Sequence, residues 1–167
     1  MKLIFVLFLI SVVNAKIIIQ KWEIQSDPKF AELKYEVKDG KSMSIDVHCL
    51  NDADDIMIKA AAYSKVDGVF NPFVAPDPIH ICKVHEHEDP LVKFMHEEIL
   101  KFGNVTKACS LKKGTYLYMH DFVVDETKFP VPLPEGEFRV DVNATIIDGG
   151  AHTHAYYSEL FFKTVKE

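Results

Sequence analysis

Short runs in which apolar and polar residues alternate recur along most of this chain, and a period of two is typical of β-strands. The alternation predicts strands over 30–37, 43–50, 56–64, 116–124, 137–147 and 153–165. In the fifth of these runs the residues expected to face inward are Phe138, Val140, Val142, Ala144 and Ile146. The run from 116 to 124 is apolar in both phases, so we expect it to be a central strand.

Turn-forming residues separate these runs. Asp39-Gly40 lies between the first two strands and predicts a hairpin, because glycine adopts a positive φ without strain. Asn71-Pro72 and 75–78 mark an expected loop, since proline withholds the backbone donor that a strand ladder needs. The stretch 125–136 contains Pro130, Pro132 and Pro134 and predicts a stiff crossing loop.

One segment has a helical period instead. Asp89 can cap a helix, Pro90 fits its first position and Gly103 fits its end. The apolar residues between them fall on one stripe: Leu91, Val92, Met95, Ile99 and Phe102. The whole pattern predicts a mainly β fold, an antiparallel two-sheet β-sandwich or cup with one amphipathic helix over about 90–102.

The N-terminus has the layout of a secretory signal peptide. Met1-Lys2 is a basic start, 3–13 is an almost unbroken apolar run, and Val13-Asn14-Ala15 resembles a cleavage site. The run is shorter than the ~20 residues that span a bilayer, which disfavours a membrane anchor. We therefore expect a signal peptide over 1–15 and one secreted, extracellular domain over 16–167, with no membrane-spanning segment.

Composition and missing motifs narrow the function. Apolar residues make up 48% and charged residues 26% of the chain, which is typical of a globular domain. The net charge of −6 repels phosphate backbones and argues against nucleic acid as a partner. The chain has neither a G-x-S-x-G nor an H-E-x-x-H motif, and the adjacent Glu97-Glu98 is interpreted as solvated surface. We expect no enzymatic activity and no cofactor.

The three cysteines are interpreted for an oxidising compartment. They allow one disulfide, and the odd thiol either stays free or pairs with another chain. We favour Cys82–Cys109, which would enclose the predicted helix and tie it to both flanking strands. Cys49 is in phase with Ile45 and Val47, and a free cysteine there would act as a small apolar residue.

Eight histidines raise the question of a metal site. Cys82-x-x-His85-x-His87 and His152-x-His154 have ligand-like spacing. No cysteine or carboxylate clearly completes either set, and Cys82 is wanted for the disulfide. Scattered solvated histidines are therefore the favoured interpretation, and we expect no metal.

Two glycosylation sequons are present, at Asn104-Val105-Thr106 and Asn143-Ala144-Thr145. Asn104 follows the expected end of the helix, and Asn143 is in the outward phase of its strand. Glycans need exposed asparagines in exported chains, so both are predicted glycosylation sites.

Aromatic residues make up 11% of the chain, and most of the phenylalanines and tyrosines after the signal peptide lie on or beside predicted strands. One interpretation is that they fill a core. The other is that the two sheets splay, the helix closes the gap, and an apolar ligand cavity lies between them. The residues expected to line such a cavity are Phe70, Phe73, Met95, Ile99, Phe102, Tyr118, Phe122, Phe138 and Val140.

The order of motifs from the helix onward resembles a known family. The motifs are Phe102-Gly103-Asn104, then Cys-Ser-Leu-Lys-Lys-Gly-Thr-Tyr at 109–116, Phe-Val-Val-Asp-Glu at 122–126, and Leu-Pro-Glu-Gly-Glu-Phe-Arg-Val-Asp at 133–141. They are similar to those of small secreted arthropod proteins that include the chemosensory A and B proteins of insect taste bristles. That family is related to the ML lipid-recognition superfamily, which includes the ganglioside activator. Ser110 stands where proline is usual in the family.

This resemblance implies a secreted β-sandwich with a lipid-sized cavity, a disulfide matching Cys82–Cys109, and no catalysis. It also implies a hydrophobic ligand, such as a fatty acid, cuticular hydrocarbon or glycolipid, and a role in chemosensory perception of pheromones. The expected function is therefore binding of a small hydrophobic ligand by a secreted protein. The alternative is a secreted protein-interaction module with a filled core, which acts on a receptor or another extracellular protein.

Overall fold

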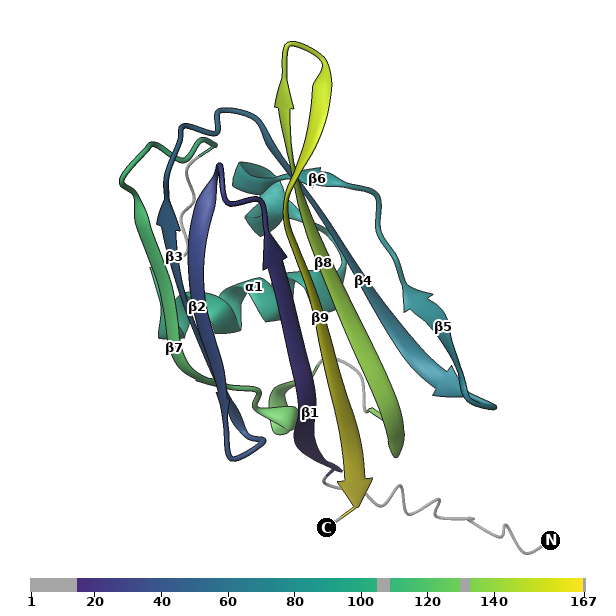
Figure 1. Cartoon of the computed structure of the whole chain (residues 1–167). Coiled ribbons are helices and arrows are strands. Elements are labelled where there is room, and N and C mark those ends of the chain that lie inside the picture. The colour runs from purple at the N-terminus through teal and green to yellow at the C-terminus, as the bar shows by residue number, and fades with distance from the viewer. Residues whose placement is uncertain (1–14, 105–108, 130–132, 167) are drawn as a thin grey trace, which may run out of the picture.

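The computed structural model describes residues 15–104, 109–129 and 133–166, whose course is shown in Figure 1. The strands are β1 (Ala15–Ser26), β2 (Ala31–Lys38), β3 (Ser42–Cys49), β4 (Ile56–Val66), β5 (Val69–Val74), β6 (Ile79–His80), β7 (Tyr116–Val123), β8 (Gly136–Asp148) and β9 (Ala151–Lys166). The helical elements are η1 (Ile81–Glu86), α1 (Pro90–Phe102) and η2 (Glu126–Lys128). The expected signal peptide over 1–15 lies outside the described residues except for Ala15, where β1 begins.

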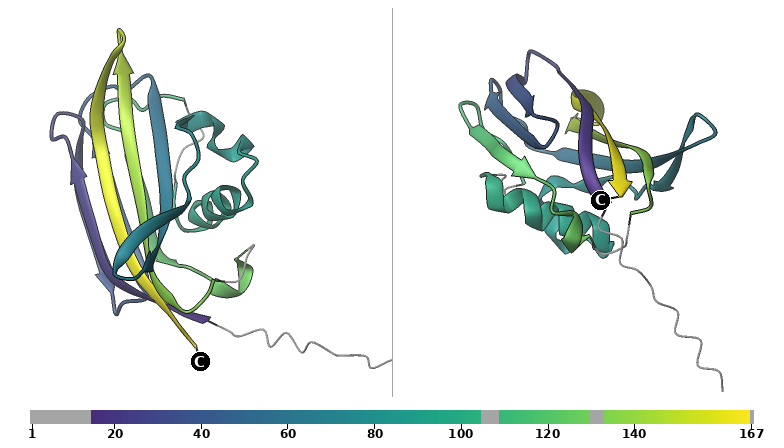
Figure 2. Two further views of the ribbon diagram at one scale, coloured as in Figure 1. Left: turned by 90° about the vertical axis from the view of Figure 1, so that its right-hand side faces the viewer. Right: turned by 90° about the horizontal axis from the view of Figure 1, so that it is seen from below.

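The strands form two antiparallel sheets. The larger has the order β1-β9-β8-β4-β5, with β6 also paired to β4, and the smaller has the order β2-β3-β7. The sheets meet along β1 and β2, where Ile19 N donates to Gly40 O at 2.8 Å, and α1 lies across the opposite, open side (Figure 2). The predicted β-sandwich with one α-helix is therefore confirmed. Within the described ranges, no helix has the length and apolar character needed to cross a membrane.

The predicted hairpin of the smaller sheet is confirmed. β2 and β3 pair in register along their whole length. Asp39 and Gly40 form the turn with φ of 54° and 62°, and two successive positive φ values match the right-handed twist of the flanking strands.

The loop expected at Asn71-Pro72 is instead part of β5, and this prediction was wrong. Pro72 lies opposite Tyr63 of β4, next to a register shift between Ala62 and Tyr63. β5 is the edge strand of its sheet, so a proline that lacks a backbone donor costs the ladder little there.

The strand expected to be central, β7, is an edge strand, and β3 is central in the smaller sheet. The apolar character of both phases misled the prediction, because one phase consists of exposed tyrosines. Tyr116 and Tyr118 are 49% and 37% exposed, whereas Met119 and Phe122 are buried. A bulge at Asp121, with φ of 51°, returns Phe122 to the inner face.

The first strand, β1, is an element that the sequence pattern did not predict. It pairs antiparallel with β9 along its whole length. A register shift between Ile19 and Lys21 places Ile19 and Trp22 on the same face. The bulge breaks the period of two, so alternation alone does not reveal this strand.

The predicted helix is confirmed at both ends. Asp89 Oδ1 accepts hydrogen bonds from Leu91 N at 2.8 Å and Val92 N at 3.2 Å, as an N-cap should. Gly103 ends the helix for a different reason than expected. Its φ of −157° is extended, but a Cβ at this position would lie 2.0 Å from Tyr118 O. Glycine is therefore required by the close approach of α1 to β7.

The cysteines are arranged as predicted. Cys82 and Cys109 form a disulfide with a Cα–Cα distance of 4.6 Å, and Cys49 is free and buried. The bridge spans 27 residues that include α1, and a loop of this size is worth about 3.5 kcal/mol in the chain-entropy treatment. Burial raises the pKa of the Cys49 thiol, which makes it a poor nucleophile in the folded protein.

We predict that Gly103→Ala destabilises the fold far more than Gly136→Ala. The new Cβ at 103 would overlap the backbone of β7, whereas at 136 the nearest atom outside the chain neighbours is a Phe138 ring carbon 3.7 Å away. The first change should cost more than about 2 kcal/mol of unfolding free energy and the second less than about 1 kcal/mol. Urea denaturation measures both, and equal losses would contradict the close approach.

Candidate functional site

The inner face of the larger sheet has small side chains at its middle. Ala60, Val142 and Ser158 lie side by side on β4, β8 and β9. Ala60 and Val142 face the interior, yet both remain partly exposed. Ser158, next to them on β9, is only 4% exposed, so the face is less covered at β4 and β8 than at β9.

Bulky side chains stand at both ends of this inner face. At one end the rings of Phe138 and Phe162 stack at 5.3 Å, and Phe73 contacts Phe138 at 6.1 Å. At the other end Ile56 and Ile146 are buried in a second cluster. Large residues therefore stand at the ends of this face, and smaller ones lie between them.

A set of aromatic rings and hydroxyl groups lies beside these smaller side chains, on the side where the two sheets meet. The rings of Trp22 on β1 and Tyr35 on β2 lie 5.6 Å apart. Tyr156 and Ser158 follow on the inner phase of β9, opposite Ala144 and Val142. Burial raises the pKa of Tyr156, and a hydrogen bond from the Ser158 hydroxyl offsets part of that rise. The pair places two polar groups inside otherwise apolar surroundings.

The helix supplies the opposite wall. Met95, Ile99 and Phe102 pack against the core cluster that contains Phe122, and the rings of Phe102 and Phe122 lie 5.4 Å apart. These four predicted cavity residues are thus brought together. Glu98 of the same helix is not solvated surface as expected: it is only 6% exposed, and Lys101 pairs with its carboxylate.

A hollow of about 410 Å³ opens between the last turn of α1 and the segment after β7. Its lining residues are Glu98, Lys101, Phe102, Val123, Val124, Asp125, Glu126, Thr127 and Lys128. Phe102 and Val124 also pack against the interior cluster, so these two side chains belong both to the lining of the hollow and to the edge of the core.

A carboxylate holds the rim of this hollow together. Asp125 caps η2, accepts hydrogen bonds from Thr127 and forms an ion pair with Lys128 at 2.8 Å. The hydrogen bond from Lys128, followed by those from Thr127, lowers the pKa of Asp125 to about 2.

Three other predicted cavity residues lie elsewhere than the interior. Phe70 is on the outer face of the larger sheet, where the Arg139 guanidinium lies 5.4 Å from its ring. Tyr118 is on the outer face of the smaller sheet, 4.9 Å from the His120 ring. Phe73 is 46% exposed at the rim of the inner face, while Phe138 and Val140 lie on that face itself.

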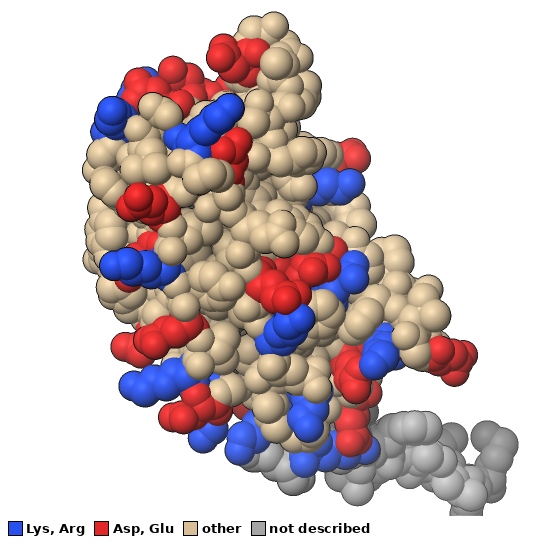
Figure 3. All heavy atoms as spheres, in the orientation of Figure 1, with Lys and Arg blue, Asp and Glu red and all other residues tan. Residues whose placement is uncertain are grey.

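The outer face of the larger sheet is charged. Arg139 forms an ion pair with Asp141 at 2.9 Å, and a longer contact with Glu159 at 3.7 Å. Burial raises the pKa of Asp141 although Arg139 opposes the rise, and burial together with Glu159 raises the pKa of Tyr157 to about 12. Figure 3 shows acidic and basic side chains intermixed over this face, without a large patch of one sign.

The outer face of the smaller sheet has a polar hollow of about 440 Å³. Its lining residues are Lys34, Tyr35, Glu36, Lys38, Ser44, Asp46, His120 and Asp121. Asp46 Oδ1 accepts a hydrogen bond from the Tyr116 hydroxyl and contacts His120 Nε2 at 2.7 Å. These contacts, Tyr116 first, lower the pKa of Asp46, and the same bond raises the pKa of Tyr116.

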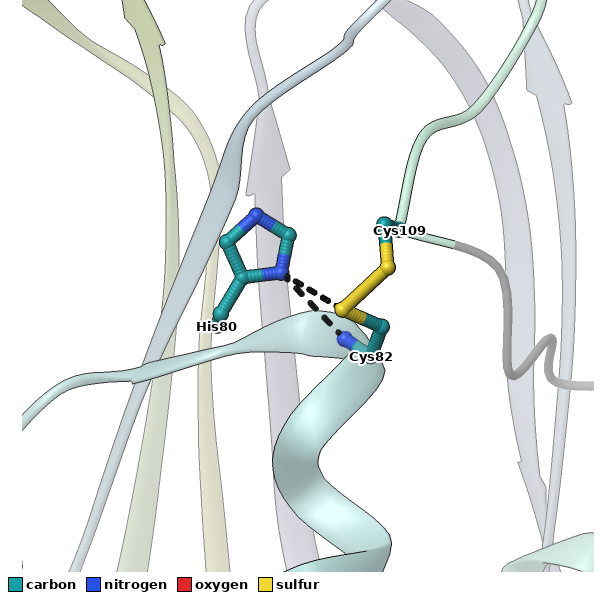
Figure 4. Close-up of side chains that lie close together, drawn as sticks. All are labelled: His80, Cys82 and Cys109. Atoms are coloured by element: carbon teal, nitrogen blue, oxygen red, sulfur yellow. Dashed lines mark hydrogen bonds between the residues drawn. A yellow bond between two sulfur atoms is a disulfide. The ribbon is translucent and has the colours of Figure 1, made fainter.

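The histidines with ligand-like spacing have other neighbours. His85 contacts Glu86 at 3.5 Å, His87 Nδ1 accepts from Asp89 N, and His154 contacts Asn143. Among the described residues, three potential ligand atoms lie within 4.8 Å of one another only at His80, Cys82 and Cys109 (Figure 4). Because both sulfurs are used in the disulfide, this group offers a metal one imidazole nitrogen.

The two predicted glycosylation sites differ in their surroundings. Asn104 Nδ2 donates to Tyr116 O at 2.8 Å, and its Oδ1 accepts from Tyr118 N at 2.6 Å. Both polar atoms of this side-chain amide are thus bonded to the backbone of β7. The rest of that sequon lies outside the described residues. Asn143 is half-buried on β8, where its Oδ1 accepts from the Thr145 hydroxyl.

Sequence reasoning missed Trp22, Tyr156 and Ser158 as members of the site. Trp22 was missed because its strand was not predicted. The tyrosine and the serine were assigned to a strand, but β9 has a register shift between Ala144 and Thr145 of its partner β8, which obscures the phase. The cross-strand pairing with the inward residues of β8 is the signal that places them.

We predict that Val142→Phe is tolerated, because Val142 and its neighbour Ala60 are both only partly buried. The unfolding free energy should change by less than about 1 kcal/mol, whereas Ile146→Phe, at a buried position 5% exposed, should cost about 1–3 kcal/mol. Thermal and urea denaturation compare the two. A loss at 142 as large as that at 146 would mean that the interior is close-packed.

We also predict an acid titration of Asp125 at about pH 2. Its pKa is lower in the folded protein than in the unfolded chain, so its contribution to stability is present above about pH 4 and is lost as the pH falls through 2. Lys128→Met should raise the pKa of Asp125, and Lys83→Met on η1 should leave this pKa unchanged. Carboxyl NMR titration measures both, and an unshifted Asp125 would contradict the rim geometry.

The central part of the chain is similar to a described family. Residues 58–140 match the family described as "Protein of unknown function (DUF1091)". A comparison with curated proteins finds no match. The matched segment runs from β4 into β8 and contains α1, the disulfide and β7. The chain is therefore similar to this family over the residues that form the helix wall, the hollow beneath it and the first five residues of β8.

Proposed function

We propose that this protein is a secreted, non-enzymatic binder of a small apolar molecule, which it holds between the two sheets beneath α1. The observation that carries the proposal is the partial exposure of the inward-facing Ala60 and Val142 at the middle of the larger sheet. The hollow beside Phe102 would be the entrance, and Lys101, Asp125 and Lys128 its polar rim.

The energetics suit an acyl or alkyl chain. Burial of one methylene contributes about 0.8 kcal/mol, so a chain of about fifteen contributes roughly 12 kcal/mol. Association costs at least about 4 kcal/mol, which leaves a dissociation constant near micromolar. The Tyr156 and Ser158 hydroxyls would receive the polar end of a fatty acid or glycolipid. A cuticular hydrocarbon has no polar end, so the Tyr156 and Ser158 hydroxyls would remain hydrogen-bonded to each other.

The sequence features point the same way. The signal peptide layout supports secretion, and the resemblance to arthropod chemosensory proteins supports a hydrophobic ligand and a role in pheromone perception. Neither feature identifies the ligand, so the class of molecule rests on the apolar interior and its few hydroxyls.

A protein-interaction module is the second candidate, and one observation favours it. Tyr116, Tyr118 and His120 form an exposed row of rings on the outer face of the smaller sheet, with centroids 6.1 and 4.9 Å apart. Exposed tyrosines are enriched where proteins bind each other. In this case the ligand would be a receptor or another extracellular protein.

Displacement of a fluorescent fatty acid tests the first proposal. The unmodified protein should bind the probe at micromolar concentration, and native mass spectrometry should detect the complex. Ile99→Lys places a charge on the inner stripe of α1 and should weaken binding at least tenfold. Glu97→Lys adds the same side chain at an exposed position of the helix and should leave affinity unchanged.

Circular dichroism would show that both variants keep the fold, and Ile99→Ala replaces Ile99→Lys if the latter does not fold. The proposal fails if the unmodified protein binds no probe, or if the helix variants have equal affinity. A stable protein partner that is lost on Tyr118→Ala, with no lipid bound, would favour the second candidate instead.

A further inference from the structure

A carboxylate contacts an imidazole, and the imidazole contacts one sulfur of the disulfide. His80, at the end of β6, contacts Asp55 Oδ1 through Nε2 at 3.0 Å and Cys82 Sγ through Nδ1 at 3.1 Å. Figure 4 shows the His80 ring, at the end of β6, directed at the sulfur of Cys82, which lies at the start of η1. These are the residue types that activate thiols in other sites, yet the sulfur here is already bonded to Cys109.

From this geometry we propose that Cys82–Cys109 is a site of thiol–disulfide exchange, assisted by His80 and Asp55, whose co-substrate is an external thiol. Cys109 is exposed, so a thiolate can reach its sulfur from solvent. Cys82 is half-buried against the imidazole and is the sulfur that leaves. This activity is independent of ligand binding between the sheets.

The hydrogen bonds assign the roles of the two ring nitrogens. Nδ1 accepts from Cys82 N at 3.5 Å, so the neutral ring has its proton on Nε2 and donates it to Asp55. The Nδ1 lone pair then faces Cys82 Sγ. A proton taken up at Nδ1 would be donated to that sulfur as it becomes a thiolate, and Asp55 would stabilise the imidazolium.

The reaction balances with two external thiols. A thiolate attacks Cys109 Sγ, a new sulfur–sulfur bond forms to Cys109, and the Cys82–Cys109 bond breaks with its electron pair on Cys82. His80 supplies the proton or hydrogen bond that Cys82 needs. A second thiolate attacks the mixed disulfide and releases the external disulfide, and the Cys109 thiolate takes a proton from water. Two external thiols are oxidised and the protein disulfide is reduced.

The ring is surrounded by groups from three separate stretches of the chain. The titratable or sulfur-bearing groups that face it are Asp55 before β4, Cys82 in η1 and Cys109 before β7. The fraction of attacking thiolate changes identically for every variant, and it cancels in a ratio of rates.

Reduction by dithiothreitol tests the proposal in the full domain. His80→Phe should slow reduction about tenfold relative to the unmodified protein at the same pH. Asp55→Asn should show a smaller effect of the same direction. His85→Phe, in η1 like Cys82 but in contact with Glu86 and not with the disulfide, is the matched control and should leave the rate unchanged.

A second measurement separates assistance from a loss of structure. In a Cys49→Ala/Cys109→Ala background Cys82 is the only thiol, and its pKa follows from the ultraviolet absorbance of the thiolate. The pKa of the Cys82 thiol should lie below the usual ~8.5, and it should rise when His80→Gln is added. Equal pKa values in this pair, or equal reduction rates for His80→Phe and His85→Phe, would overturn the proposal.

Discussion

The larger sheet has an apolar inner face that must be kept from water, and the rest of the molecule is arranged to cover it. The smaller sheet joins it along β1 and β2 and covers one side, while α1 covers the other. The helix is kept in this place because the disulfide between Cys82 of η1 and Cys109 closes the segment that contains it, and because Gly103 at its end contacts β7. At the middle of the face Ala60 and Val142 remain partly exposed, so the cover is thinnest over β4 and β8.

Local signals made much of this fold predictable. Asp39-Gly40 defined a hairpin, and Asp89 with Pro90 defined the start of the helix, because each of these signals depends on neighbours in the chain. The predictions were wrong where they depended on the phase of alternation along a strand or on the position of the strand in its sheet. β1 has a bulge that breaks its alternation, and β7 has exposed tyrosines in the phase that was expected to be covered.

The candidate site was predictable only in part. The helix stripe of Met95, Ile99 and Phe102 meets Phe122 as expected, since a helical period defines one face of α1. Phe70 and Tyr118 lie on outer faces, because aromatic character alone does not state on which side of a strand a ring will point. The face on which a ring lies depends on its neighbours in the adjacent strands, and these are known only once the register of the sheet is known.

The contact between the end of α1 and β7 has a consequence for behaviour at high concentration. β7 is the last strand of its sheet, and an open strand edge invites pairing with another molecule. Here Asn104 bonds to the outward backbone groups of Tyr116 and Tyr118 through its main chain and its side-chain amide, as a further strand would. One asparagine thereby closes an edge that would otherwise template aggregation.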